Sequence, residues 1–108
     1  GYEYFLFSYE YTFAGFAGIH EENGNLFLSK LYVHEDFRGK GIASYMFQKF
    51  IEICKTRKLK KIWLTCNRHN TNTLAIYEHL GFKKVREQVA DIRNGFVMDD
   101  YIMEYDVV

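Results

Sequence analysis

The first third of the chain consists of short apolar runs that favour β-strands. Aromatic side chains are frequent in these runs, and Asn23-Gly24 separates the second run from the third. Asn-Gly is the strongest short hairpin signal, so the third run should return antiparallel to the second. Gly15 and Gly18 lie within the second run, where they permit a bulge or a close approach of the backbone. The predicted strands cover residues 4–9, 13–20 and 26–33.

The spacing of apolar residues becomes helical after Gly41. Apolar residues now recur at i, i+3 and i+4, and polar side chains take the opposite face. The apolar positions are Ile42, Ala43, Met46, Phe47, Phe50, Ile51 and Cys54. This pattern predicts an amphipathic helix that ends near Arg57, where a basic stretch complements the negative end of the helix dipole.

The second half of the chain predicts a strand, a second helix and two more strands. Gly81 lies where the residue after a helix must turn left-handed, and Arg93-Asn94-Gly95 joins the last two strands as a hairpin. These elements cover residues 61–66, about 71–80, 82–92 and 96–107. The order βββ-α-β-α-ββ predicts an α/β fold, with two helices crossing over a mixed, mainly antiparallel sheet in one domain over residues 1–108.

Composition narrows the classes of function. Apolar residues make up 48% of the 108 residues, and 14 basic side chains balance 14 acidic ones. A net charge of zero argues against a nucleic-acid-binding domain, so an anionic ligand must be held by local groups. No apolar run could span a membrane, and Cys54 and Cys66 have no zinc-ligand spacing, so no metal is expected. We expect a soluble, cytoplasmic protein with two free, partly buried thiols.

The turn before the first helix has the chemistry of a phosphate site. A strand ends at Val33, and Gly39 and Gly41 then precede the helix. Free N–H groups at a helix start bind phosphate oxygens, and Arg38 and Lys40 add local positive charge. The spacing matches neither a P-loop nor a dinucleotide-binding turn. An ordinary strand-to-helix turn is the alternative on this segment alone.

Two motifs together resemble the GNAT superfamily of N-acetyltransferases. Arg38-Gly39-Lys40-Gly41-Ile42-Ala43 fits the family's R/Q-x-x-G-x-G/A turn. Asn70 and Tyr77, followed by Gly81-Phe82, are similar to its second motif, and one helix and one strand lie between the two. The resemblance covers about residues 4–108, and the ending is similar to bacterial members, including some polyamine acetyltransferases. It implies an enzyme that transfers an acetyl group from acetyl-CoA to a primary amine of a small molecule or a protein, without a metal.

The resemblance also implies roles for individual residues. The turn Arg38 to Ala43 would bind the coenzyme A pyrophosphate through backbone N–H groups. The main chain of Leu31, Tyr32 and Val33 would pair with the pantetheine arm. Asn70 would bind the pantetheine region, and Tyr77 would lie near the sulfur and protonate the departing thiolate. From the bare sequence, Tyr77 is a core tyrosine on an amphipathic helix, and only the motif favours catalysis.

The general base stays open at this stage. Some family members use a strand glutamate near the position of Phe27, which this chain lacks. The open candidates are His34, Glu35, Glu21, Asp99 and Asp100, with His69 and His79 as weaker ones. Asp99, Asp100 and Glu104 also place negative charge near the final strands, which would suit a polyamine or another cationic amine.

Family members normally carry a strand and one or two helices before the segment that starts at Tyr4. We therefore expect an N-terminally truncated, partial acetyl-CoA-binding domain. Either another chain or domain supplies the missing acceptor wall, or the chain is a fragment that binds the cofactor poorly. A non-catalytic acyl-CoA-binding or regulatory module with an incomplete acceptor site is the alternative. The exposed aromatic edge near residues 4–7 also favours a homodimer.

Overall fold

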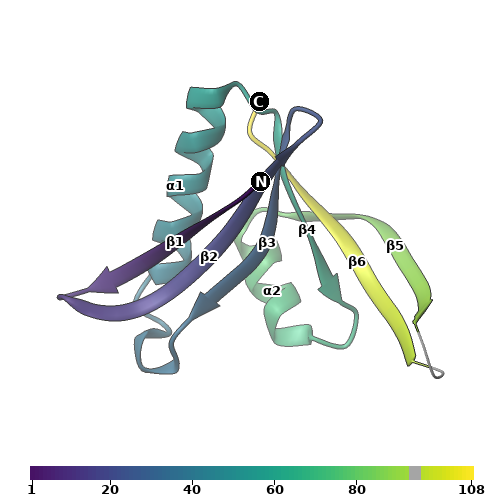
Figure 1. Cartoon of the computed structure of the whole chain (residues 1–108). Coiled ribbons are helices and arrows are strands. Elements are labelled where there is room, and N and C mark those ends of the chain that lie inside the picture. Colours follow the sequence, from purple (N-terminus) through teal and green to yellow (C-terminus); the bar gives the residue numbers. More distant parts are fainter. Residues whose placement is uncertain (93–95) are drawn as a thin grey trace. The chain divides into compact units, whose positions relative to one another are not determined.

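The computed structural model describes residues 1–92 and 96–108, with side chains for 1–89 and 99–108. Its elements are β1 (Tyr2–Tyr9), β2 (Thr12–Glu22), β3 (Asn25–Val33), the 3-10 helix η1 (Glu35–Phe37), α1 (Ile42–Arg57), β4 (Lys61–Asn67), α2 (Thr71–Leu80), β5 (Lys83–Ile92) and β6 (Phe96–Asp106) (Figure 1). They form two compact units, residues 1–62 with 106–108 and residues 63–105. The predicted α/β class and the order βββ-α-β-α-ββ are confirmed.

In the first unit, β1, β2 and β3 form an antiparallel sheet in that order. β1 and β2 are longer than predicted, and a two-residue loop, Glu10-Tyr11, joins them directly. Both loop residues have positive φ, 50° and 67°, which matches the twist of a tight hairpin. The predicted loop Asn23-Gly24 also has φ of 52° and 80°, so that hairpin is confirmed.

Both glycines of β2 do what the sequence predicts. A Cβ on Gly15 would collide with the carbonyl oxygen of Tyr32, so β3 approaches here as closely as only glycine permits. The pairing of β2 with β3 shifts register between Gly18 and Ile19, where the predicted bulge is present. A Cβ on Gly18 would lie 2.8 Å from the Tyr4 ring, which lies directly over it.

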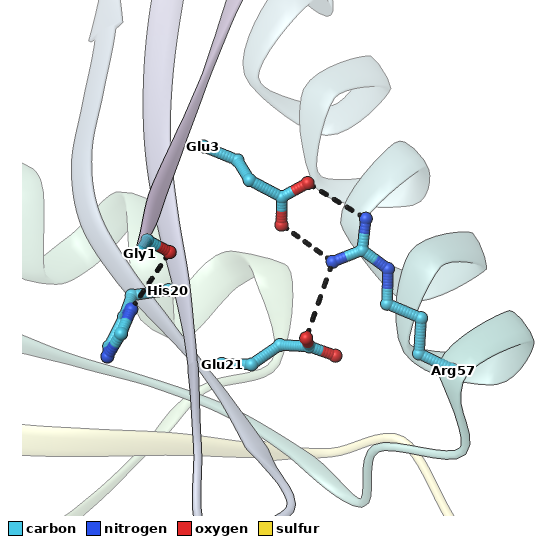
Figure 2. A network of polar contacts seen from close by, with 5 residues as sticks. All are labelled: Gly1, Glu3, His20, Glu21 and Arg57. Atoms are coloured by element: carbon cyan, nitrogen blue, oxygen red, sulfur yellow. Dashed lines mark hydrogen bonds and ion pairs between the residues drawn. The ribbon is translucent and has the colours of Figure 1, made fainter.

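Helix α1 covers one face of this sheet, as Figure 1 shows. Its predicted apolar positions are buried except Ala43, which is half-buried, and Phe50 packs edge-on against Phe5 and Phe7 with ring centres 6.1 and 6.4 Å apart. At the helix end, Arg57 donates to both carboxylate oxygens of Glu3 at 2.6 and 2.9 Å (Figure 2). It also lies 3.8 Å from Glu21, so this residue ties α1 to both β1 and β2.

In the second unit, β4, β6 and β5 are neighbours in that order, and β5 pairs antiparallel with β6. Ile92 pairs with Phe96, which confirms the final hairpin, although its turn Arg93-Asn94-Gly95 lies outside the described residues. Gly81 ends α2 with a φ of 108°, as predicted. Within the described part of the chain, no helix is long and apolar enough to cross a membrane.

Candidate functional site

The turn after β3 is built by local contacts in the first unit. The His34 N–H donates to the Ala14 carbonyl at 2.7 Å, which anchors the chain just past the strand end. The 3-10 helix η1 follows, and its Phe37 packs on Tyr9 with ring centres 5.7 Å apart. The Nε of Arg38 donates a hydrogen bond back to the Val33 carbonyl at 3.3 Å. These contacts bring the strand end and the glycines together in one compact turn.

The two glycines of the turn have a backbone that other residues rarely adopt. Gly39 and Gly41 have φ of 79° and 77°, in the left-handed region. A Cβ at either position would meet no heavy atom within 4 Å, so the space over the main chain is open. The backbone conformation therefore favours glycine at both positions, and the glycines also leave room for a ligand to approach the main chain.

The start of α1 carries donors that the helix itself does not use. Gly41 is the N-cap and supplies no side-chain hydrogen bond, and the first turn has no acidic residue. The first intrahelical bond runs from Tyr45 N–H to the Gly41 carbonyl at 3.0 Å. The N–H groups of residues 42–44 precede this bond, so they lie at the positive end of the helix dipole. Such a helix start suits a phosphate group.

The two basic residues of the turn are held close to it. The Nε of Arg38 is hydrogen-bonded to the Val33 carbonyl, and the Nζ of Lys40 lies 5.7 Å from the centre of the Tyr9 ring. Both positive charges thus stay beside the glycines, where they favour an anion in a protein whose net charge is zero.

Asn70 and Tyr77 belong to α2 in the second unit. The Asn70 side-chain oxygen accepts from the Thr73 N–H at 3.4 Å, so this residue caps the helix. Tyr77 is 8% exposed and packs edge-on against Phe82 with ring centres 5.5 Å apart. The Phe82 N–H donates to the Tyr77 carbonyl at 3.0 Å. In the second motif, Asn70 therefore caps helix α2, and Phe82, which follows the helix, packs against Tyr77.

Burial, with a smaller contribution from the nearby Cys66, raises the pKa of Tyr77 to about 12. The hydroxyl therefore keeps its proton at any physiological pH. The carboxylate of Asp100 in turn contributes to the raised pKa of the Cys66 thiol, although burial of that thiol is the larger cause. Tyr77, Cys66 and Asp100 are thus three electrostatically linked groups within this unit.

The predicted site residues fall into two groups that the structure describes separately. Those of the strand end and turn lie in the first unit: Leu31, Tyr32, Val33, Arg38, Gly39, Lys40, Gly41, Ile42 and Ala43. Asn70 and Tyr77 lie in the second unit. The roles that the resemblance implies for these residues remain predictions.

The candidates for a general base differ in how they are paired. Glu21 lies near Arg57 and Asp99 is bound by Arg68, so both carboxylates have a cationic neighbour. The Nδ1 of His34 accepts from the Asp36 N–H at 3.2 Å, which places the proton of the neutral ring on the other nitrogen. Asp100 is 9% exposed and is the buried carboxylate among them. The geometry selects none of them as the base.

Sequence reasoning missed two features. One is a set of contacts around Arg68 with side chains of β5 and β6. The other is an open groove of about 600 Å³ between β1 and α1, lined by Phe7, Tyr45 and Ile53 among others. Both bring together residues far apart in the chain, and no local pattern signals such contacts. Among the described residues, no group of three or more His, Cys, Asp or Glu side chains could hold a metal ion.

Relatives of this chain are acetyltransferases. It is 29% identical over 84 residues to the spermine/spermidine N(1)-acetyltransferase of Bacillus subtilis, covering 69% of this chain and 55% of that protein. The fold matches the Escherichia coli ribosomal-protein-S18-alanine N-acetyltransferase, with a TM-score of 0.80, 22% identity, and 98% of this chain and 69% of that chain covered. It also matches a Thermoplasma acidophilum N-acetyltransferase in complex with coenzyme A, with a TM-score of 0.77, 22% identity, and 97% and 60% covered.

The chain spans about half the length of the curated relatives it matches, 55% in the case of the Bacillus subtilis enzyme. The model of the acetyltransferase (GNAT) family matches residues 1–82, which include the glycine turn, Asn70 and Tyr77. This match, with the strand, turn and capped helix described above, shows that the chain belongs to the GNAT acetyltransferase family.

Proposed function

We propose that this protein transfers an acetyl group from acetyl-CoA to a primary amine of a small molecule or a protein by direct attack of the amine. Membership of the GNAT family over residues 1–82 is the observation that carries the proposal. The open, left-handed glycine turn at the start of α1 supports it, because this is the local geometry that a phosphate-bearing coenzyme needs.

The residues of the turn fit the coenzyme. A side chain at Gly39 or Gly41 would fill the open space over the backbone, and the start of α1 has no side-chain cap that would compete for its N–H groups. The main chain from Arg38 to Ala43 would hold the pyrophosphate. The strand end Leu31–Val33 would pair with the pantetheine arm, and Asn70 would donate from its side-chain amide.

The coenzyme supplies an acetyl group activated as a thioester. The chain must then hold the reactants in place and manage two protons. Tyr77 is the candidate to deliver one of them to the departing sulfur, because its hydroxyl is protonated at physiological pH. The second proton, released by the amine, requires a base, for which Glu21, His34, Glu35, Asp99 and Asp100 remain candidates.

The name of the Bacillus subtilis relative, a spermine/spermidine acetyltransferase, supports a cationic amine as acceptor. The acidic residues near β6 support it less directly. The carboxylate of Asp99 is already 2.9 Å from the Arg68 guanidinium, so much of its charge is balanced within the protein. We therefore propose a primary amine and favour a cationic one.

A thiol-release assay with a panel of amines tests this function. Wild-type protein should release coenzyme A with at least one primary amine. Tyr77→Phe should lower kcat by about 100-fold or more, in the range of general acid catalysis, and change the acetyl-CoA affinity by less than about twofold. Tyr45→Phe removes an exposed hydroxyl on α1 and serves as the control.

Three results would each decide a different part of the proposal. Full activity of the Tyr77→Phe variant would exclude the general acid. A coenzyme that binds but is never consumed with any amine would favour the non-catalytic acyl-CoA-binding module. Equal loss of activity in the Tyr45→Phe control would show that the effect of the Tyr77 change is not specific.

A further inference from the structure

The segment between β4 and α2 is anchored by one residue outside both motifs. The Arg68 N–H donates to the Asp99 carbonyl at 2.9 Å, and its Nε donates to the Asp99 carboxylate at 2.9 Å. Its Nη1 donates to the Tyr101 hydroxyl at 3.0 Å and lies 2.9 Å from the Glu87 carboxylate. Arg68 therefore makes three hydrogen bonds to two residues of β6 and one ion pair with a residue of β5.

These contacts need a guanidinium group. The centre of the Arg68 guanidinium lies 4.7 Å from the centre of the Tyr101 ring, while Lys84 lies 4.5 Å from the same ring. The planar guanidinium of an arginine has a fixed geometry, in which it can stack on a ring and donate to several acceptors at once. The ammonium group of a lysine cannot do this. The Arg68 side chain is only 30% exposed, so these bonds are partly shielded from water.

Arg68 lies in the short link that precedes α2. The helix starts at Thr71, and the Asn70 N–H donates to the Asn67 carbonyl at 3.0 Å. The His69 N–H donates to the Asn67 side chain at 2.9 Å. The short link from Asn67 to Asn70 is thus closed by its own hydrogen bonds, and Arg68 attaches this closed link to β6.

We propose that Arg68 is a positioning residue that fixes the start of α2 against β6 and so orients Asn70 for coenzyme A. This inference rests on the proposed function, because it assigns Asn70 to the coenzyme. Without the Arg68 contacts, the capped end of α2 gains freedom, and the Asn70 amide spends less time in its binding orientation. Loss of Arg68 then appears mainly as weaker coenzyme binding.

Two measurements on the whole chain test this role. Calorimetric titration with acetyl-CoA compares the wild type with Arg68→Ala, Arg68→Lys and Arg86→Ala. The Arg86→Ala variant is the control, because it removes an exposed arginine of β5. We expect about tenfold weaker binding for Arg68→Ala, an effect typical of residues that orient a ligand-binding group. Arg68→Lys should restore little of it, and Arg86→Ala should stay within about twofold.

Amide hydrogen exchange supplies a readout that does not need the coenzyme. The Thr73 N–H, which bonds to the Asn70 cap, should exchange about ten times faster in Arg68→Ala, as expected for local opening of a helix end. The N–H of Phe50 in the middle of α1 should keep its rate. If Arg68→Ala does not fold, Asp99→Asn is measured in its place. Asparagine keeps nearly the shape of aspartate but carries no charge, so the contact between Arg68 and position 99 is weakened.

The outcomes separate the two proposals. Wild-type protein that binds no acetyl-CoA would contradict the proposed function, while the exchange of Thr73 would still test the anchoring of α2. A lower unfolding midpoint with unchanged coenzyme affinity and unchanged Thr73 exchange would overturn the role of Arg68, which would then contribute to stability alone. Full recovery by Arg68→Lys would also overturn it, since charge and not geometry would then be sufficient.

Discussion

Replacing Gly41 by alanine separates the backbone strain of the turn from its use as a ligand site. Gly41 has a φ of 77°, and Gly24, in the hairpin between β2 and β3, has a nearly equal φ of 80°. A Cβ at either position meets no atom within 4 Å, so neither substitution creates a collision. Gly24→Ala is therefore a matched control with the same strain at a position that no proposal assigns to the coenzyme.

The magnitudes follow from these two facts. A left-handed alanine costs about 1–2 kcal/mol, and the smaller freedom of the unfolded chain returns about half of this, so each variant should lose about 1 kcal/mol of unfolding free energy. The added methyl at Gly41 also occupies the open space over the turn. Loss of one charge-assisted hydrogen bond to a phosphate, about 1.5–3 kcal/mol, would weaken coenzyme binding by roughly 10- to 100-fold.

Denaturant unfolding measures the first effect, and calorimetric titration with acetyl-CoA measures the second. Both variants should show a similar loss of stability, and only Gly41→Ala should show the loss of affinity. Equal affinities of the two variants for acetyl-CoA would contradict a coenzyme site at Gly41, because the turn would then be an ordinary strand-to-helix connection. A stability loss at Gly41 but not at Gly24 would contradict the assignment of equal strain.

Three further predictions concern pH and association. Since the pKa of Tyr77 rises from its ordinary value near 10 to about 12 on folding, its contribution to stability should be fully present below pH 10 and fall by up to about 2–3 kcal/mol as pH rises through 12. Burial also raises the pKa of Cys54 to about 11, so urea unfolding should show the Tyr77 loss as the difference between wild type and Tyr77→Phe, and a difference that stays constant over this pH range would exclude Tyr77 as its source. The hydrogen bonds from Arg57 lower the pKa of Glu3, so their stabilisation should be present above the ordinary pKa near 4.5 and vanish as pH falls below the folded value. The stability difference between wild type and Arg57→Gln should thus shrink towards pH 3, and a difference independent of pH would exclude the pair as its source. Leu6, 79% exposed on the edge strand β1, should support a homodimer, so Leu6→Lys should lower the mass seen by light scattering while Val108→Lys should not; a wild type that is monomeric at high concentration would contradict this.

Local signals made the fold largely predictable. The helix Ile42–Arg57 begins and ends where the apolar spacing predicts, because its glycine start and its basic end are encoded by neighbouring residues. The second helix also begins and ends as predicted, since Asn70 caps it and Gly81 ends it. The loop Glu10-Tyr11 was not predictable, because neither residue type favours the positive φ that both adopt.

The candidate site was predictable only where it is contiguous. The glycine turn lies within a few residues, so its spacing alone indicates a phosphate site. The contact between Arg68 and Asp99 joins positions 31 residues apart, and the adjacency of β4 and β6 that brings them together is visible only in the structure. The general base is undetermined for a similar reason, because its assignment depends on where the acceptor binds.

Calorimetric titration of the chain 1–108 with acetyl-CoA tests whether the glycine turn and the helix that follows it form a coenzyme site. We expect saturable binding at one site per chain, competed by free coenzyme A. Circular dichroism on the same sample should show that the protein is folded. A folded chain that takes up no acetyl-CoA even at millimolar concentration would contradict the claim that this turn and helix form a coenzyme site.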